Sequence, residues 1–418
     1  MDERLKIFVS AYACEPGLGS EIGVGWHWVL EMSKYFELWV LTRESNRHRI
    51  ESWIKEHPEF AGIHFIHYDL PKWARFWKKG LRGVRIYYNL WQMMTNKIVE
   101  HTMKREGIKV FHHLTYGNAL WRVSSYGQRQ CFIWGPLGGL ETIPREFSKH
   151  YTLKWRIVEA VRRLTVATCR WNIGLRKRVR NADLLLCKTR ASLQKMAFFP
   201  NKHKILFTDV APNCRNYYNF AVNTAKRTNF ISVGRLDAWR GFDLAIEAFA
   251  KVHEQEALTY LTIVGEGSDR KRLERLIVAK GLTDSVRLIG KVTMDEYKKL
   301  MTDADVVVNA SLKEGGVTVA FDAMSMGKPI VCVDSGGYTR YFNEDYAVVV
   351  DLTGRDEVID ELAKGMLKLT VPATREAFGS KAKDASELWS WERHGLEIRD
   401  VITECYENWI RSIKINNK

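Results

Sequence analysis

The sequence predicts two α/β domains of the Rossmann-like type, each a parallel sheet covered by helices. A length of 418 residues exceeds one ordinary core and suits two domains of about 200 residues each. Short apolar runs alternate with amphipathic segments in both halves, which is the pattern of parallel strands joined by helices. A polar stretch without periodicity, residues 211–229, separates the halves. We therefore expect domains at 1–212 and 213–388, followed by a helical segment at 389–418.

Apolar runs predict the strands, and the amphipathic segments between them predict helices. In the first half the expected strands are 5–13, 37–43, 63–70, 109–115 and 182–188, with helices at 20–35 and 49–58 among those between them. In the second half they are 230–236, 260–267, 286–292 and 305–312, with helices at 242–254, 269–281, 295–304 and just after the Glu-Gly-Gly of 314–316. Thr293 and Glu296 have the spacing of a capping box at a helix start.

Composition and charge narrow the functional classes. The mean hydropathy of -0.27 is typical of a globular chain, and no apolar run is long enough to cross a bilayer. Seven scattered cysteines without metal-ligand spacing, and a start without a signal-peptide pattern, lead us to expect a reducing, cytoplasmic location. Residues 1–210 carry 35 Lys and Arg against 18 Asp and Glu, a balance of +17, whereas the remainder carries 29 against 31. This asymmetry predicts that the first half meets an anionic membrane or a polyanion.

A glycine-rich turn, EPGLGSEIGVGW at 15–26, follows the first expected strand and opens the first helix. Gly17 and Gly19 allow the backbone to approach an anion, and the helix N-terminus offers free N–H groups. The same glycines also suit an ordinary tight turn. The spacing is not GxGxxG, so a dinucleotide site is not indicated here.

Two arginines follow the first strand of the second half, in SVGRLDAWRGFD at 232–243. Arg235 leaves the strand end and Arg240 lies in the loop to the next helix. Guanidinium groups at the carboxyl edge of a parallel sheet suit a diphosphate. The alternative is a pair of solvated surface arginines.

A third pattern, SLKEGGVTVAFDAMSMGKPIV at 311–331, places Glu314 and two glycines between a strand end and a helix start. The carboxylate suits sugar hydroxyls and the helix N-terminus suits phosphate. Asp322 lies eight residues beyond Glu314, about two helical turns, so both can face one cleft. Alternatively, Glu314 is a helix cap and Asp322 a surface residue.

These parts, in this order, resemble the donor-binding domain of the GT-B glycosyltransferases, specifically the retaining group 1 class, glycosyltransferase family four. SVGRLDAWRG is similar to the GR-x(4)-KG element of that class, LTIVGEGSDRKRLERL to its VGxG strand-turn-helix, and EGGVTVAFDA to its Glu-x7-Glu element. In the first half, ACEPGLGSEIGVGW and IWGPLGG resemble a bacterial branch of the class. The resemblance implies two Rossmann-like domains facing across a cleft, with a C-terminal helix that packs back on the N-terminal domain.

The resemblance also implies roles at the donor site. Arg235 and Arg240 would clamp the donor diphosphate, with Arg240 where the family usually has Lys. Glu314 would bind the donor-sugar hydroxyls. Asp322 stands in the place of a Glu that holds the ribose, and it is one methylene shorter. The backbone around the sugar and phosphate would come from Gly315, Gly316, Val317 and Thr318, and that around the base from Gly265, Gly290, Lys291 and Val292.

The first half would complete the site. Gly17 and Gly19 would meet the diphosphate from the opposite domain. His112 or His113, of which we favour His113, resembles the histidine near the donor sugar, although a lone histidine at a strand end is more often structural. Catalysis would rest on arginines and helix N-termini rather than on a metal ion, because no metal-binding aspartate pair stands out. We expect a nucleotide-diphosphate sugar as co-substrate, no cofactor and no metal.

Two segments of the first half are strongly basic, which suits contact with an anionic membrane. Residues 71–105 and residues 153–180 each have nine Lys and Arg and one Glu. In the first of them aromatic side chains are interleaved: Trp73, Phe76, Trp77, Tyr87, Tyr88 and Trp91. This pattern predicts peripheral contact with an anionic membrane and a saccharide acceptor that is lipid-linked. Ordinary core-packed helices or nucleic-acid binding are the alternatives.

Three rival functions fit parts of the sequence. A GT-B-like sugar-nucleotide epimerase would bind the same donor without a membrane acceptor. A non-catalytic pseudo-transferase would explain Asp322, and a nucleic-acid-binding protein would explain the charge alone. The retained Glu314 and both arginines favour a retaining transferase of bacterial surface polysaccharide or glycolipid synthesis.

Overall fold

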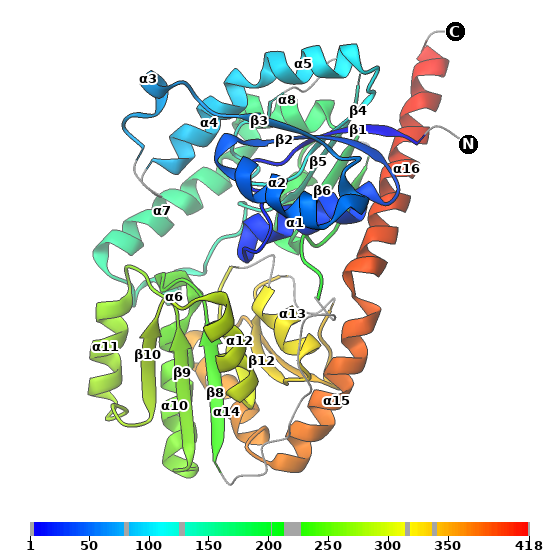
Figure 1. Cartoon of the computed structure of the whole chain (residues 1–418). Helices are drawn as coiled ribbons and strands as arrows, with labels where there is room; N and C mark the ends of the chain where they lie inside the picture. The colour runs from blue at the N-terminus through cyan, green and yellow to red at the C-terminus, as the bar shows by residue number, and fades with distance from the viewer. Residues whose placement is uncertain are drawn as a thin grey trace. The chain divides into compact units, whose positions relative to one another are not determined.

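The structure, a computed structural model, describes residues 4–78, 83–124, 130–201, 203–212, 227–313, 318–336 and 341–416 (Figure 1). The chain forms two compact units. The N-terminal unit consists of residues 1–140, 167–209 and 391–418, and the C-terminal unit of residues 141–166 and 210–390. Relative to the division expected from sequence, residues 141–166 group with the C-terminal unit, because their contacts are made there.

The N-terminal unit contains a seven-stranded sheet in the order β3-β2-β1-β4-β5-β6-β7, with every pair parallel. Its strands are β1 (Lys6–Ser10), β2 (Glu37–Arg43), β3 (His64–Tyr68), β4 (Val110–His113), β5 (Cys131–Leu137), β6 (Leu184–Cys187) and β7 (Lys204–Leu206). The sequence did not predict β5, in which Gly135 and Pro136 interrupt the apolar run, or β7, which is three residues long. Register pairs Ser10 with His113 and Val9 with His112, so the two histidines face opposite sides of the sheet.

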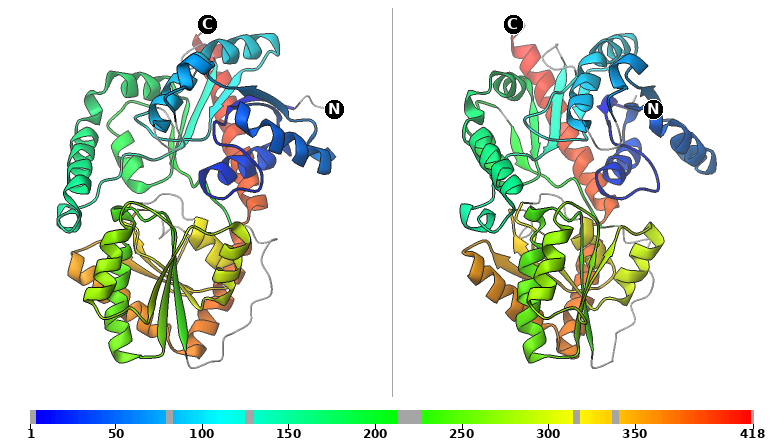
Figure 2. Two further views of the ribbon diagram at one scale, coloured as in Figure 1. Left: turned by 60° about the vertical axis from the view of Figure 1, so that its left-hand side comes forward. Right: turned by 90° about the vertical axis from the view of Figure 1, so that its left-hand side faces the viewer.

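Helices cover both faces of this sheet (Figures 1 and 2). They are α1 (Ser20–Ser33), α2 (Arg47–Glu56), α3 (Lys72–Arg75), α4 (Val84–Met94), α5 (Asn96–Arg105), α8 (Ile173–Asn181) and α9 (Arg190–Met196), with short 3-10 turns η1 (Glu44–Asn46), η2 (Pro58–Phe60) and η3 (Cys169–Trp171). The last helix, α16 (Trp391–Asn416), packs against α1 and β5, which confirms the expected return of the C-terminal helix to the N-terminal domain. Cys131 of β5 and Cys405 of α16 are buried with their sulfur atoms 3.6 Å apart.

The C-terminal unit contains a six-stranded parallel sheet in the order β10-β9-β8-β11-β12-β13. Its strands are β8 (Thr228–Val233), β9 (Thr259–Val264), β10 (Val286–Gly290), β11 (Val306–Asn309), β12 (Ile330–Asp334) and β13 (Ala347–Asp351). The strand order runs outward from β8 to β10 and then returns to β11 on the other side of β8. A parallel sheet binds ligands at such a reversal, outside the carboxyl ends of the strands.

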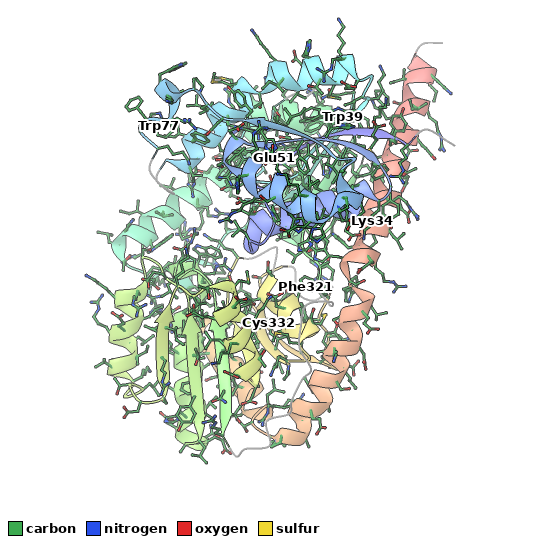
Figure 3. All side chains as sticks on the ribbon, in the orientation of Figure 1. Lys34, Trp39, Glu51, Trp77, Phe321 and Cys332 are labelled. Carbon is green, nitrogen blue, oxygen red and sulfur yellow. The ribbon has the colours of Figure 1, made fainter. Side chains whose placement is uncertain are left out.

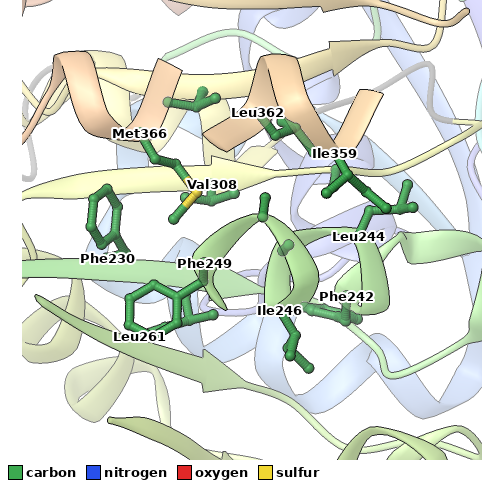
Figure 4. Close-up of a cluster of buried hydrophobic side chains, with 14 of the residues drawn as sticks. Phe230, Phe242, Leu244, Ile246, Phe249, Leu261, Val308, Ile359, Leu362 and Met366 are labelled. Carbon is green, nitrogen blue, oxygen red and sulfur yellow. The ribbon is translucent and has the colours of Figure 1, made fainter. Parts of the chain in front are cut away.

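Two pairs of helices pack together in the C-terminal unit. Its helices are α6 (Arg145–Ser148), α7 (Leu153–Ala167), α10 (Phe242–Gln255), α11 (Arg270–Ala279), α12 (Met294–Asp303), α13 (Thr318–Ser325), α14 (Arg355–Lys368) and α15 (Pro372–Leu388), with the 3-10 turn η5 (Ala238–Arg240). Contacts join α10 to α14 and α13 to α15. In Figure 4, side chains of α10 and α14 meet Phe230, Leu261 and Val308 from the strands in one buried apolar core. Figure 3 labels Phe321 of α13 and Cys332 of β12, both of which are buried.

The capping box predicted at the start of α12 is present. Thr293 and Glu296 form the predicted capping box, with the Thr293 hydroxyl accepting from the Glu296 N–H and the Glu296 carboxylate accepting from the Thr293 N–H.

The aromatic pattern of residues 71–105 does not lie wholly on the surface. Trp73 and Phe76 are exposed and Trp77 is half-buried, whereas the remaining three are buried core residues: Tyr87, Tyr88 and Trp91. Among the described helices, none is long and apolar enough to span a membrane.

Candidate functional site

Close backbone packing holds together the loops at the carboxyl edge of the C-terminal sheet. Gly265, after β9, has φ +140°, and a Cβ there would lie 1.8 Å from the carbonyl oxygen of Gly234, after β8. Gly241, which precedes α10, has φ +67°, and a Cβ there would lie 1.9 Å from the carbonyl oxygen of Ala310, after β11. Because no side chain fits at either position, glycine is required for the three loops to meet.

Both predicted arginines lie in the loop after β8. The side chain of Arg235 is 60% exposed, and its Nε donates to Oδ2 of the buried Asp237 at 2.5 Å. The Arg240 guanidinium lies 4.4 Å from the centre of the Trp239 ring. The two cations are therefore brought to one loop, each oriented by a neighbour.

The carboxylate and glycines of the third pattern, Glu314 to Val317, lie outside the described residues. Thr318 begins α13 directly after them. The side chain of Lys313, directly before them, is 9% exposed, and its Nζ is hydrogen-bonded to the carboxylate of Glu159 from α7. Lys313 Nζ also lies 5.2 Å from the centre of the Trp239 ring, and the same ring contacts Arg240. Burial, with a contribution from Arg162, lowers the pKa of Lys313 to about 8 although Glu159 opposes the shift.

The pair of Lys313 with Glu159 was not predicted from sequence. Glu159 is fully buried, and it is the sole acidic residue of an otherwise basic helix. That isolated acid was an available signal, because a carboxylate that is buried needs a charged or hydrogen-bonding partner. Its partner, 154 residues away in sequence, gave no local pattern that could have identified it.

Asp322 lies on α13 and is buried, so the alternative that it is a surface residue is wrong. The Tyr297 hydroxyl of α12 donates a hydrogen bond to its Oδ2 at 2.7 Å. A carboxylate held by a tyrosine from the neighbouring helix has a fixed orientation. The role of Asp322 toward a ribose stays a prediction.

The turn predicted to meet a base follows β10. The Gly265 N–H donates to the Gly290 carbonyl at 2.8 Å, which joins the turns after β9 and β10. Gly290 has φ +93°, Lys291 is exposed and Val292 is half-buried. Arg270 supports the same turn, since its guanidinium donates to the Leu288 carbonyl and to Glu266. The predicted residues of this turn are thus assembled beside the loop that carries Arg235.

In the N-terminal unit, the glycine-rich turn is exposed and anchored on both sides. Gly17 has φ +72° with no atom within 4 Å of a Cβ built there, so its backbone conformation, rather than crowding, favours glycine. Gly19 lies at the N-cap of α1. Before the turn, Glu15 is paired with Arg49, and after it Glu21 accepts the Tyr116 N–H at 2.7 Å.

The two predicted histidines are fully enclosed in the N-terminal unit. His112 Nε2 is hydrogen-bonded to the Gly135 carbonyl at 2.8 Å, and its ring packs against Trp28 of α1. His113 Nε2 is hydrogen-bonded to the Tyr88 hydroxyl of α4 at 2.9 Å. Burial lowers the pKa of His112 to about 4 and that of His113 to about 3, so both rings are neutral near pH 7. This enclosure favours packing for His112, and the catalytic role of His113 stays a prediction.

Two cavities lie away from these residues, at the amino ends of the N-terminal strands. One of about 350 Å³ is bordered by the starts of β2 and β3, and one of about 470 Å³ by the segments before β4 and β5. Across the described ranges, no group of three or more His, Cys, Asp or Glu side chains is placed to hold a metal ion.

Comparison with known proteins identifies a family model and several relatives that match part of the chain. The family model of group 1 glycosyl transferases matches residues 219–385. An uncharacterized glycosyltransferase of Methanocaldococcus jannaschii is 33% identical over 171 residues, which cover 40% of this chain and 43% of that protein. A Campylobacter jejuni N-acetylgalactosaminyltransferase, whose name specifies a diphospho-undecaprenol-linked saccharide, is 29% identical over 216 residues, 50% of this chain and 56% of that protein. The chain thus spans about half the length of these relatives.

Solved structures resemble the whole chain. Sucrose-phosphate synthase from Thermosynechococcus elongatus has a TM-score of 0.64 at 15% identity, over 97% of this chain and all of that one. The Anabaena protein HepE, in complex with UDP and glucose, has a TM-score of 0.58 at 15% identity, over 96% of this chain and all of that one. Together with the two parallel sheets, these likenesses confirm the predicted GT-B fold.

Proposed function

We propose that this chain, whose residues 219–385 match the family model of group 1 glycosyl transferases, moves a sugar from a nucleotide-diphosphate sugar to a saccharide acceptor. The observation that carries this proposal is the loop after β8. It presents the exposed Arg235 and the stacked Arg240 beside backbone turns that glycines 241 and 265 hold together. Fixed guanidinium groups with close backbone approach suit a diphosphate.

The reaction places negative charge where these cations lie. When the anomeric C–O bond breaks, its electron pair goes to the diphosphate oxygen and the sugar gains oxocarbenium character. The acceptor hydroxyl oxygen forms the new bond, and its proton passes to the departing phosphate on the same face, which gives retention. Arg235, Arg240 and the amides at the start of α13 stabilise the departing charge without reorganisation, so we propose that no divalent metal is required.

The proposed donor contacts extend from this loop. Glu314 binds the hydroxyls of the donor sugar, and the pair of Lys313 with Glu159 fixes the chain directly before it. Asp322 holds the ribose, and the Tyr297 hydroxyl orients its carboxylate, which supports a shorter side chain in the place of Glu. Gly290 and Lys291 contact the base.

The proposed acceptor is a lipid-linked saccharide in bacterial surface polysaccharide or glycolipid synthesis. Two observations support this choice: the +17 balance of residues 1–210, and a relative whose printed name specifies an undecaprenol-linked substrate. A cationic half keeps an enzyme near acceptors confined to an anionic membrane. The protein would then work as a peripheral protein on the cytoplasmic face.

A donor-binding screen followed by transfer assays tests the proposal. Thermal shift against a panel of nucleoside diphosphates and sugar nucleotides should reveal one stabilising base, because a bound ligand raises the melting temperature. Arg235→Ala should abolish that shift, whereas the control Arg275→Ala, an exposed arginine of α11, should retain it. Epimerisation of the donor sugar without acceptor, or binding without any turnover, would contradict a transferase. Activity that EDTA removes and magnesium restores would contradict metal independence.

A further inference from the structure

The helix α7 has two unlike faces. Its inward face packs on the C-terminal unit through Trp155, whose Nε1 donates to the Ser268 hydroxyl at 3.1 Å and whose ring contacts the core. Val166 is buried on the same side, as is Glu159, which is paired with Lys313. The spacing of positions 155, 159 and 166 places their side chains on one face of the helix.

Its outward face is aliphatic, where a helix of a soluble protein usually presents polar side chains. Leu153, Ile157, Val161 and Leu164 are exposed by 71%, 56%, 58% and 66%. Their spacing of four, four and three residues places them in one continuous stripe. A contiguous apolar surface of this kind is typical of a face that another phase or molecule covers.

The charges beside this aliphatic stripe have one sign. Lys154 and Arg156 are exposed, and a rotation of about 100° per residue places them at its two margins. The sole acid of the helix, Glu159, faces inward. Arg162 and Arg163 point toward the body of the unit, where they donate to the Glu141 carbonyl and the Ser148 hydroxyl. The stripe therefore has cationic edges and no outward carboxylate on its own helix.

We propose that α7 docks on an anionic lipid surface, with the aliphatic stripe at the acyl boundary and Lys154 and Arg156 against the head groups. A second copy of α7 fits less well, because two such helices would bring like charges together without an acid to pair them. Nucleic acid would engage the cations but leave the stripe exposed to water. This surface lies within residues 153–180, one of the two basic segments expected from sequence to meet a membrane, and it narrows that expectation to one face of α7. It rests on the proposed peripheral role and not on the donor chemistry.

Vesicle co-sedimentation of the full chain tests this surface. The vesicles are phosphatidylglycerol with phosphatidylethanolamine, compared with phosphatidylcholine alone. The double variant Ile157→Ser with Leu164→Ser should bind the anionic vesicles at least about tenfold more weakly, because it removes two inserted aliphatic side chains. The control Val278→Ser on α11, with an equally exposed aliphatic side chain at 66%, should bind like wild type.

A second pair of variants separates charge from insertion. Lys154→Gln with Arg156→Gln should weaken binding to anionic vesicles by about tenfold or more and leave a salt-resistant remainder. Equal binding by wild type and the Ile157 and Leu164 variant would overturn the proposal, as would equal binding of wild type to both vesicle types. A wild-type dimer in light scattering that becomes a monomer in the same double variant would assign the stripe to self-association instead.

Discussion

The strand ends at which the sequence predicts functional side chains differ in solvent exposure between the two sheets. After β8, Arg235 stays 60% exposed and its single carboxylate partner, Asp237, is buried beneath it. At the end of β4, His112 and His113 are at most 1% exposed. The segment that follows each strand makes the difference. Glycines keep the loops beyond β8 compact, whereas Tyr88, Tyr116 and Trp121 stack on one another over the end of β4.

This difference shows that a strand-end position predicts function best for a side chain whose burial costs much free energy. A guanidinium stays charged at any ordinary pH, so it remains at the surface or takes a charged partner. An imidazole can lose its proton and enter a core as a neutral ring, as the lowered pKa values of His112 and His113 indicate.

The buried ion pair near the donor loop should give the largest effect. Glu159→Ala leaves Lys313 as a buried, unpaired cation, which should cost about 3–5 kcal/mol in the free energy of unfolding. Chemical denaturation would measure it. Glu159→Ala combined with Lys313→Met should recover most of the loss, and a double variant as unstable as the single one would contradict the pairing.

Arg235→Ala should give the next largest effect, on catalysis rather than stability. Loss of one fixed cation at the departing diphosphate should lower kcat by about 10²- to 10³-fold. The melting temperature should change little, because the side chain is mostly exposed. Transfer at the wild-type rate would break the comparison, since the exposed strand end would then have no role in the reaction.

Glycine substitutions sharpen the comparison between crowded and open turns. Gly265→Ala should cost about 1–3 kcal/mol or more, since its Cβ would meet the Gly234 carbonyl oxygen at 1.8 Å. Gly17→Ala has only the backbone conformation against it and should cost about 1–2 kcal/mol. Equal thermal stabilities for the two variants would show that the loops relax around the new methyl group.

The enclosed histidines predict a smaller, pH-dependent effect. Because the folded pKa of His113 is lowered to about 3, the unfolded chain binds more protons as pH falls below about 6.5, and stability falls with it. Between pH 6.5 and 5 the loss should be roughly 1–2 kcal/mol.

His113→Phe with Tyr88→Phe removes the hydrogen-bonded pair with little change of shape and should remove the His113 share of this slope, whereas His112, whose pKa is also lowered, keeps its own share. Denaturation at both pH values would show it. Transfer by this double variant should stay within about tenfold of wild type if His113 only packs. A hundredfold loss of the transfer rate would support a catalytic role for His113.

Most of the fold was predictable from local patterns, and the exceptions have local causes. The strands and helices of residues 230–312 follow the predicted segments to within a few residues, because apolar period and capping signals agree there. The strands β12 and β13 were not assigned, although their runs Ile330–Asp334 and Ala347–Asp351 are apolar. In the site, motif order gave Arg235, Arg240 and Asp322. Tyr297 and Lys313 could not be found, because their contacts join distant segments, and Glu159 was visible only as the lone acid of a basic segment, without its partner.

The division of the chain into units has a consequence for recombination between relatives. The chain passes from one unit to the other at 140/141, 166/167, 209/210 and 390/391. A chimera joined once near residue 212 would pair a foreign donor domain with the α7 of the recipient, and Lys313 would face a Glu159 from another lineage. An exchange of the N-terminal unit that keeps both cores intact must therefore transfer three pieces together: 1–140, 167–209 and 391–418.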